Sequence, residues 1–294
     1  MERNRLINLD FLRVIAIISV IFYHAKLNIP YITFMNGYLG VDIFFFLSGY
    51  LLTTIYKIEN NKFSIIDFLK KRILRIFPCY LMVCIVVLIF SFFYYLPYPY
   101  INIAIEALTS LLFVSNYYYS LTSFNYGAEP ALLKALLHTW TLSLEIQVYL
   151  ILALLYTIKN KKLLLNFFLI LITISIYLFI ERHFNINDKT YYLTELRLWQ
   201  FLFGAILAFI PKIDLNKHIT LVIFSTVVVL IYYLLNFEND FSYVLQSKFI
   251  LILSAVLAYL KAPGINFNLI TNIFVKLTQY ISRISYSLYL WHFP

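Results

Sequence analysis

The chain has 294 residues, of which 62% are hydrophobic and 19% aromatic, whereas only 13% are charged. Soluble domains carry about 25% charged residues, so this composition disfavours a soluble enzyme, a disordered tail and a nucleic-acid-binding protein. The net charge of +9 comes from short basic blocks between apolar runs, which is typical of the cytoplasmic loops of a membrane protein. We therefore expect an all-α, polytopic transmembrane helical bundle embedded in a lipid bilayer.

The apolar segments predict about nine spans, because a membrane-spanning helix needs about 20 mostly apolar residues. In chain order the predicted spans are Leu6–Ala25, Gly37–Tyr56, Ile76–Ile105, His138–Ile158, Leu163–Ile180, Glu195–Ile210, Ile219–Phe237, Tyr243–Leu260 and Leu277–Phe293. The segment Pro97–Leu137 is predicted to be an outer-face excursion that is partly re-entrant, because a further crossing there would worsen the charge distribution. Most Lys and Arg residues then lie on the side of the N-terminus, which predicts a cytoplasmic N-terminus in the cell membrane.

The first predicted span contains three ionisable side chains, Asp10, Arg13 and His24. At about 100° per residue they fall within roughly 60° of one another and form one polar stripe. Ionisable groups inside a membrane are costly and usually functional. Asp10 and Arg13 could instead neutralise each other three residues apart, but that interpretation leaves His24 unexplained.

Two later spans also carry ionisable groups that share a helix face. Arg72 and Arg75 lie three residues apart at a cytoplasmic mouth, where they suit a phosphorylated ligand or form an ordinary positive-inside anchor. His138, Glu145 and Tyr149 are spaced to share one face, where they could exchange protons with a hydroxyl substrate. A buried Glu–Arg pair that orients the helices is the alternative.

Four further polar positions carry weaker signals. Asp42 opens the second span, and Ser48 lies in a small-residue stretch that allows close helix approach and is a weak nucleophile candidate. Tyr286 and His292, near the end of the chain, are spaced along the last span and are typical of side chains at a membrane interface.

Six segments together resemble the acyltransferase-3 family of bacterial membrane O-acyltransferases. They occur in family order over nearly the whole chain, at Leu9–His24, Gly40–Leu52, Lys70–Tyr80, His138–Tyr149, Arg197–Gly204 and Ile284–His292. The resemblance implies a ten-helix membrane domain with an outer re-entrant loop. It also implies transfer of an acyl group, often acetyl, from cytoplasmic acyl-CoA to a hydroxyl of an extracytoplasmic glycan or lipid-linked sugar.

The resemblance further implies roles for individual residues. His24 would be the general base on the acceptor hydroxyl or a transient acyl carrier, and Glu145 would orient or repolarise an imidazole. Three arginines would hold the CoA phosphates: Arg13, Arg72 and Arg75. Supporting positions are Asp10, Asp42, Ser48, His138, Trp140, Ser143, Tyr149, Arg197, Tyr286 and His292. Thr141 and Ile146 depart from the usual Ser and from a common second Glu of the family motif.

Acyl-CoA, with acetyl-CoA the expected form, is a substrate in this interpretation, and we expect no tightly bound cofactor and no metal ion. The family pattern predicts one more helix after the last motif, so residues 1–294 are expected to form a single membrane domain that is incomplete at its C-terminus. Two alternatives stay open: a transporter or flippase of a lipid-linked sugar, and an inactive truncated family member. Charges near the membrane midplane would suit a transporter, although the sequence has no repeated halves.

Overall fold

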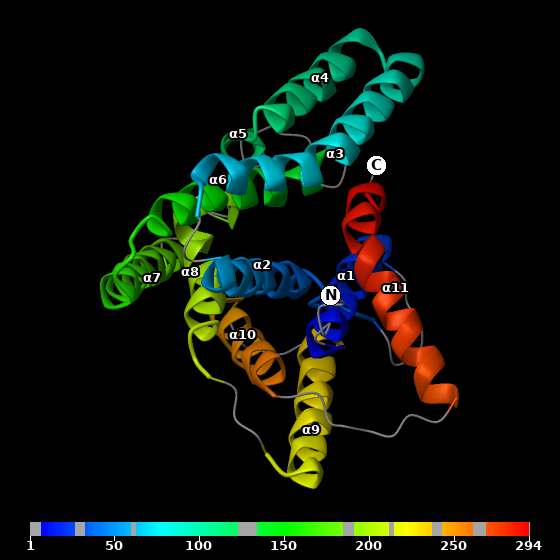
Figure 1. Cartoon of the computed structure of the whole chain (residues 1–294). Helices are drawn as coiled ribbons and strands as arrows, with labels where there is room; N and C mark the ends of the chain where they lie inside the picture. The colour runs from blue at the N-terminus through cyan, green and yellow to red at the C-terminus, as the bar shows by residue number, and fades with distance from the viewer. Residues whose placement is uncertain are drawn as a thin grey trace. The chain divides into compact units, whose positions relative to one another are not determined.

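The computed structural model describes residues 7–26, 33–59, 63–122, 134–184, 191–211, 215–236, 243–260 and 269–293. All regular secondary structure in these residues is helical (Figure 1). The helices are α1 (Ile7–Ala25), α2 (Leu39–Glu59), α3 (Ile65–Tyr94), α4 (Pro97–Leu111), α5 (Ser115–Thr122), η2 (Leu137–Thr139), α6 (Trp140–Leu155), α7 (Lys161–Phe184), α8 (Thr194–Leu207), α9 (Lys217–Asn236), α10 (Tyr243–Tyr259) and α11 (Leu269–Trp291).

Six of these helical segments are long and apolar enough to cross a membrane: α1, α2, α3, η2 with α6, α7 and α9. The predicted all-α, multi-pass class is therefore confirmed. α8 has 14 residues and α10 has 17, which is shorter than a typical span. The predicted number of nine spans stays a prediction, as does the re-entrant excursion, of which residues 123–133 lie outside the described residues.

The prediction that Ile76–Ile105 forms a single span is wrong. The helix α3 begins earlier, at Ile65, and ends at Tyr94, and α4 begins at Pro97. Leu96 is extended, with φ −64° and ψ 160°, because the ring of a following proline disfavours helical backbone in the residue before it. Proline is well tolerated at the first position of a helix, so an unbroken apolar run divides into two helices here.

The chain divides into two compact units, and each is described by itself. Unit 1 comprises Met1–Thr54 and Phe203–Tyr289, and unit 2 comprises Ile55–Leu202 and Leu290–Pro294. Unit 1 is thus assembled from two stretches that are far apart in the sequence, whereas unit 2 is built mainly from the stretch between them.

In unit 1, α10 packs against both α1 and α9. The side-chain amide of Asn8 donates to the carbonyls of Leu257 and Leu260 at 3.1 and 3.0 Å, so α1 caps the end of α10. Gly40 allows α2 to approach α1 closely, since a Cβ there would lie 2.5 Å from the carbonyl oxygen of Ala16. These close contacts hold α2 and α10 against α1, the helix that carries the polar side chains Asp10, Arg13 and His24.

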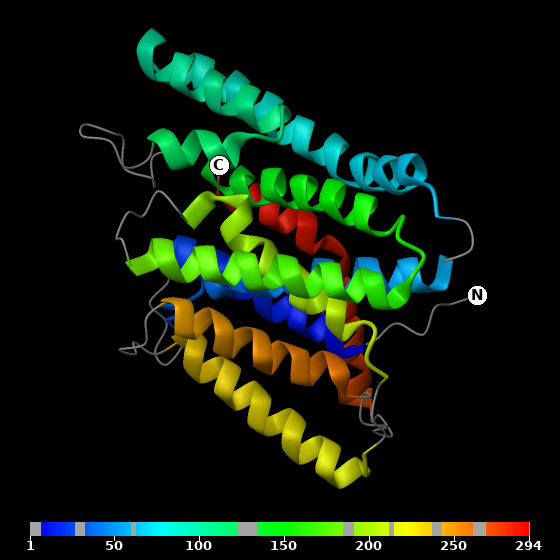
Figure 2. The same cartoon turned by 90° about the vertical axis from the view of Figure 1, so that its left-hand side faces the viewer.

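In unit 2, α3 packs along α4 and also against α6, while α5 contacts α4 and α6. Figures 1 and 2 show α3 and α4 side by side. Tyr80 of α3 stacks on Phe113 with ring centroids 5.5 Å apart, and its hydroxyl donates to the Ser110 carbonyl at 3.0 Å. The Ser110 hydroxyl in turn shares a 2.7 Å bond with that of Thr139, so this packing extends to the residue just before α6.

Candidate functional site

Unit 1 holds the predicted acid–arginine pair of α1. Asp10 is buried and Arg13 is half-buried, and both bond to Ser282 of α11. The Ser282 hydroxyl donates to Asp10 Oδ1 and accepts from Arg13 Nη1 at 3.4 Å. A serine therefore links the two charged side chains, a partner that their spacing of three residues does not reveal. The link to α11 fixes the guanidinium within a helix of mainly apolar residues.

His24 lies in the last turn of α1, about three turns beyond Arg13. Its ring packs edge-on against Tyr23 with centroids 5.2 Å apart. Asp42, in the first turn of α2, is 1% exposed, and the Tyr243 hydroxyl shares its one proton between the two carboxylate oxygens, which lie 3.0 and 3.1 Å away. Ser48 is half-buried further along α2. In unit 1 the structure thus places an imidazole and a carboxylate at the same end of neighbouring helices.

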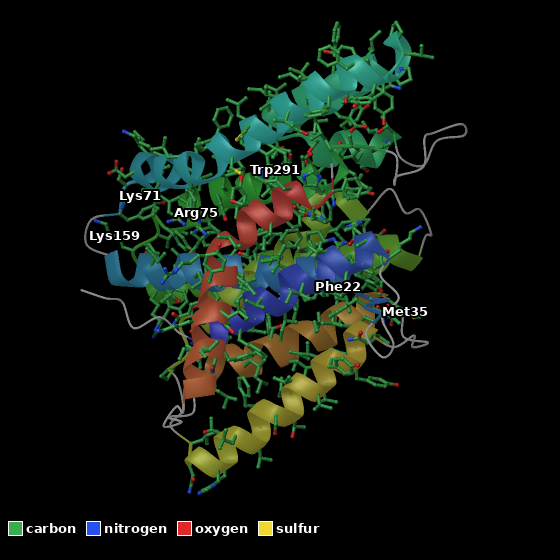
Figure 3. All side chains as sticks on the ribbon, turned by 90° about the vertical axis from the view of Figure 1, so that its right-hand side faces the viewer. Phe22, Met35, Lys71, Arg75, Lys159 and Trp291 are labelled. Carbon is green, nitrogen blue, oxygen red and sulfur yellow. The ribbon has the colours of Figure 1, made fainter. Side chains whose placement is uncertain are left out.

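The basic cluster of the third predicted span lies in unit 2, at the start of α3. Arg75 and Lys71 are exposed, while Arg72 is half-buried with its guanidinium 5.9 Å from the Phe68 ring centre. Lys159, in the α6–α7 connection, lies at the same end of this unit as Lys71 and Arg75 (Figure 3). This basic end of unit 2 can attract an anion, because exposed guanidinium and ammonium groups pair well with phosphate. The three arginines implied to bind the donor are divided between the units.

The motif that begins at His138 is almost entirely buried in unit 2. Trp140 packs against the rings of Tyr191 and Tyr192 at 5.2 and 5.3 Å. The Ser143 hydroxyl shares a 2.8 Å bond with Ser115 of α5. Burial and hydrogen bonding hold these side chains in one arrangement.

The predicted common face of His138, Glu145 and Tyr149 is realised only in part. The Tyr149 hydroxyl donates to the Glu145 carboxylate, as their spacing of four residues on α6 allows. His138 instead lies in the short 3₁₀ helix η2, so the α-helical spacing does not apply to it. Its ring packs 5.7 Å from that of His292 and 5.6 Å from that of Phe293, also in unit 2.

Arg197 is completely buried in α8 of unit 2. Its Nε donates to the Tyr191 carbonyl at 3.0 Å, and its guanidinium stands 4.1 Å from the Tyr191 ring centre. The rings of Phe179 and Trp140 lie 5.7 and 6.0 Å away. The planar cation is therefore enclosed by aromatic faces, an arrangement that stabilises a buried arginine. Tyr286, another supporting position, is half-buried on α11 in unit 1.

Sequence reasoning missed a buried acid next to this motif. Glu106 of α4 is 2% exposed and accepts bonds from the Tyr119 hydroxyl and the Leu136 backbone N–H, both at 3.2 Å. Burial, aided by the Glu106 carboxylate, raises the pKa of Tyr119 well above its usual value, so the phenol stays protonated and donates. Lys134 is 5% exposed and donates to Thr122 at 3.1 Å. These bonds fasten the residues that lead into η2.

A second missed network joins three helices of unit 2 around Gln147. The Gln147 amide donates to Asn116 Oδ1 at 2.9 Å and to the Phe113 carbonyl at 2.8 Å. Asn116 donates to Thr194 Oγ1 at 3.0 Å, and Thr194 donates back to Gln147. A polar residue in the middle of an apolar run is the only sequence signal for such a network, and it does not identify the partners.

The fold and these clusters define a multi-pass helical membrane protein with ionisable side chains inside its helices. The sequence profile of the acyltransferase-3 family, described as an acyltransferase domain, matches residues 6–294. The chain therefore belongs to the acyltransferase-3 family.

The chain is similar to bacterial proteins that are named as O-acetyltransferases. The chain is 31% identical over 309 residues to the O-acetyltransferase OatA of Staphylococcus aureus strain NCTC 8325, covering 97% of the chain and 50% of the relative. It is 31% identical over 316 residues to the peptidoglycan O-acetyltransferase OatA of Listeria monocytogenes, covering 100% of the chain and 50% of the relative. The chain thus spans about half the length of these curated relatives. No solved structure matches it.

Proposed function

We propose that the chain is a membrane O-acetyltransferase that moves an acetyl group from cytoplasmic acetyl-CoA to a hydroxyl of an extracytoplasmic cell-envelope glycan. The observation that carries the proposal is the family match over residues 6–294, together with relatives named as O-acetyltransferases, one of them acting on peptidoglycan. The proposal also includes a cytoplasmic N-terminus and about nine spans, because the Lys and Arg distribution favours them.

The residue roles in this proposal come from the resemblance to the family, and the chemistry of each side chain supports them. The basic end of unit 2, with the half-buried Arg72 and the exposed Arg75, suits the phosphates of the donor. Arg13 adds a guanidinium held by Ser282 inside α1. His24 takes the proton of the acceptor hydroxyl as general base, or carries the acetyl group transiently. Glu145 orients or repolarises an imidazole.

A transfer assay on the purified full chain tests this function. The chain is placed in lipid nanodiscs with radiolabelled acetyl-CoA and chitotetraose, a β-1,4-linked N-acetylglucosamine tetramer, and labelled sugar and free CoA are measured. We expect wild-type transfer, and for His24→Ala a loss of about a hundredfold or more, since a general base contributes at least that factor. His218→Ala is the matched control, because His218 is an exposed histidine at the start of α9. Transfer by His24→Ala at the wild-type rate would remove His24 from the mechanism.

A further inference from the structure

Three tyrosines and a buried carboxylate surround the His24 end of unit 1. The ring of Tyr23 contacts that of His24 at 5.2 Å, Tyr23 contacts Tyr38 at 5.6 Å, and Tyr38 contacts Tyr243 at 5.6 Å. Tyr243 in turn donates to both oxygens of Asp42. We name Tyr23, Tyr38, Tyr243 and Asp42 the tyrosine platform. It forms a continuous series of contacts that begins at the imidazole.

The platform combines accessible aromatic surface with polar atoms. Tyr23 is 38% exposed, and Tyr38 and Tyr243 are half-buried. The Tyr38 hydroxyl donates to Gln246 Oε1, a buried amide of α10. Sites for small polar ligands typically contain aromatic rings that are partly accessible and lie next to a few well-positioned polar groups. A sugar fits this chemistry, because its C–H face stacks on the accessible aromatic surface while its hydroxyls bond to the phenol oxygens. The buried Asp42 carboxylate and the buried Gln246 amide hold two of those phenols in place.

The turn that presents Tyr38 is fastened to the end of α9. Asn36 bonds to the carbonyls of Leu235 and Leu234, at 3.0 Å through its backbone N–H and at 2.9 Å through its side-chain amide. Phe34 has a positive φ of 45°, which is strained for a bulky residue, and its N–H donates to Asn236 Oδ1 at 3.1 Å. Such a conformation persists only where the surrounding structure determines it. The platform is therefore organised before any ligand arrives.

The geometry points to a sugar-binding subsite at the tyrosine platform that holds the acceptor glycan beside His24. This inference rests on the proposed function and adds the acceptor-binding residues to it. Because Tyr23 lies in direct ring contact with His24, a sugar stacked on the platform presents its hydroxyls to the imidazole. The subsite would set the affinity for the acceptor and leave the affinity for acetyl-CoA unchanged.

Binding and transfer are measured separately on the full chain in lipid nanodiscs. The dissociation constant of chitotetraose is determined by saturation-transfer NMR, and the KM values of chitotetraose and acetyl-CoA are determined in the transfer assay. We expect Tyr38→Ala and Tyr243→Ala to raise the dissociation constant and the KM of the sugar about two- to twelvefold, since an aromatic contact contributes about 0.5–1.5 kcal/mol and about 1.4 kcal/mol is a factor of ten. The KM of acetyl-CoA should not change. Tyr280→Ala, at an exposed tyrosine of α11 in the same unit, is the control and should alter neither.

A conservative variant keeps the test decisive if an alanine variant does not fold. Tyr243→Phe retains the ring and loses the bond to Asp42, so we expect a two- to threefold weaker sugar affinity in a folded protein. Sugar binding that depends on the platform, without any acetyl transfer, supports the subsite and contradicts the proposed function. The subsite is overturned if the wild type transfers acetyl groups and these variants keep its KM for the sugar. It is also overturned if the wild type does not bind chitotetraose. The tyrosines would then be packing residues at the membrane interface.

Discussion

Arg197 shows how a single buried cation is accommodated in this protein. Its side chain is fully buried, stacks on Tyr191 and donates to the carbonyl of that residue. Lysine has no planar group to stack and no Nε donor, so Arg197→Lys should leave a buried carbonyl without its bond. We expect a loss of about 2 kcal/mol in stability, seen as a lower midpoint of thermal unfolding in detergent.

The matched control for this prediction is Arg283→Lys. Arg283 is exposed on α11, so the same exchange should leave the unfolding midpoint within error of the wild type. An Arg197→Lys protein as stable as the control would show that the guanidinium contributes through its charge alone, and that its stacking on Tyr191 is dispensable.

At the scale of helices, Gly204 lets α8 approach α2 closely within unit 1. A Cβ at this position would lie 2.1 Å from the carbonyl oxygen of Phe46 and 3.0 Å from the backbone nitrogen of Tyr50. Both atoms belong to the backbone of α2, which cannot move aside without shifting the whole helix. Gly204→Ala should therefore sharply reduce the amount of folded protein in the membrane, measured as the monodisperse fraction after detergent extraction.

Ile206→Ala, in the same helix, serves as the comparison for the glycine variant. It removes atoms from a half-buried side chain and creates no overlap, so its yield should stay near that of the wild type. Equal yields for the two variants would mean that α8 can separate from α2 at little cost.

The helices could be predicted from sequence because an apolar run of about 20 residues has the length of a membrane-spanning helix and seldom forms another structure. The run through Ile76–Ile105 misled the prediction, since hydropathy does not register the break that Pro97 imposes. The side-chain partners could not be predicted. Ser282 is 272 residues from Asp10, and no spacing rule connects them. Glu106 likewise bonds to Tyr119 and Leu136, which lie outside its own helix α4, so helical periodicity offers no guide to these partners.

For the whole molecule, the distribution of Lys and Arg predicts which residues face the cytoplasm. Met35, 47% exposed in the α1–α2 connection, should lie outside, and Lys159, exposed between α6 and α7, should lie inside. In a background lacking Cys79 and Cys84, Met35→Cys should react with a membrane-impermeant thiol reagent in intact cells. Lys159→Cys should react only after the membrane is permeabilised. The reverse pattern would invert the topology and remove the cytoplasmic donor site.

The division of the chain between the units has a consequence for the order of its biosynthesis. Unit 1 joins Met1–Thr54 to Phe203–Tyr289, and the turn before α2 is fastened by residues at the end of α9. A ribosome delivers α1 and α2 long before α9 exists, so these first helices wait in the bilayer while most of unit 2 is made. The end of unit 1 that carries His24 therefore gains Tyr243 and its contacts with α9 only late in synthesis, because both come from the second stretch of the unit.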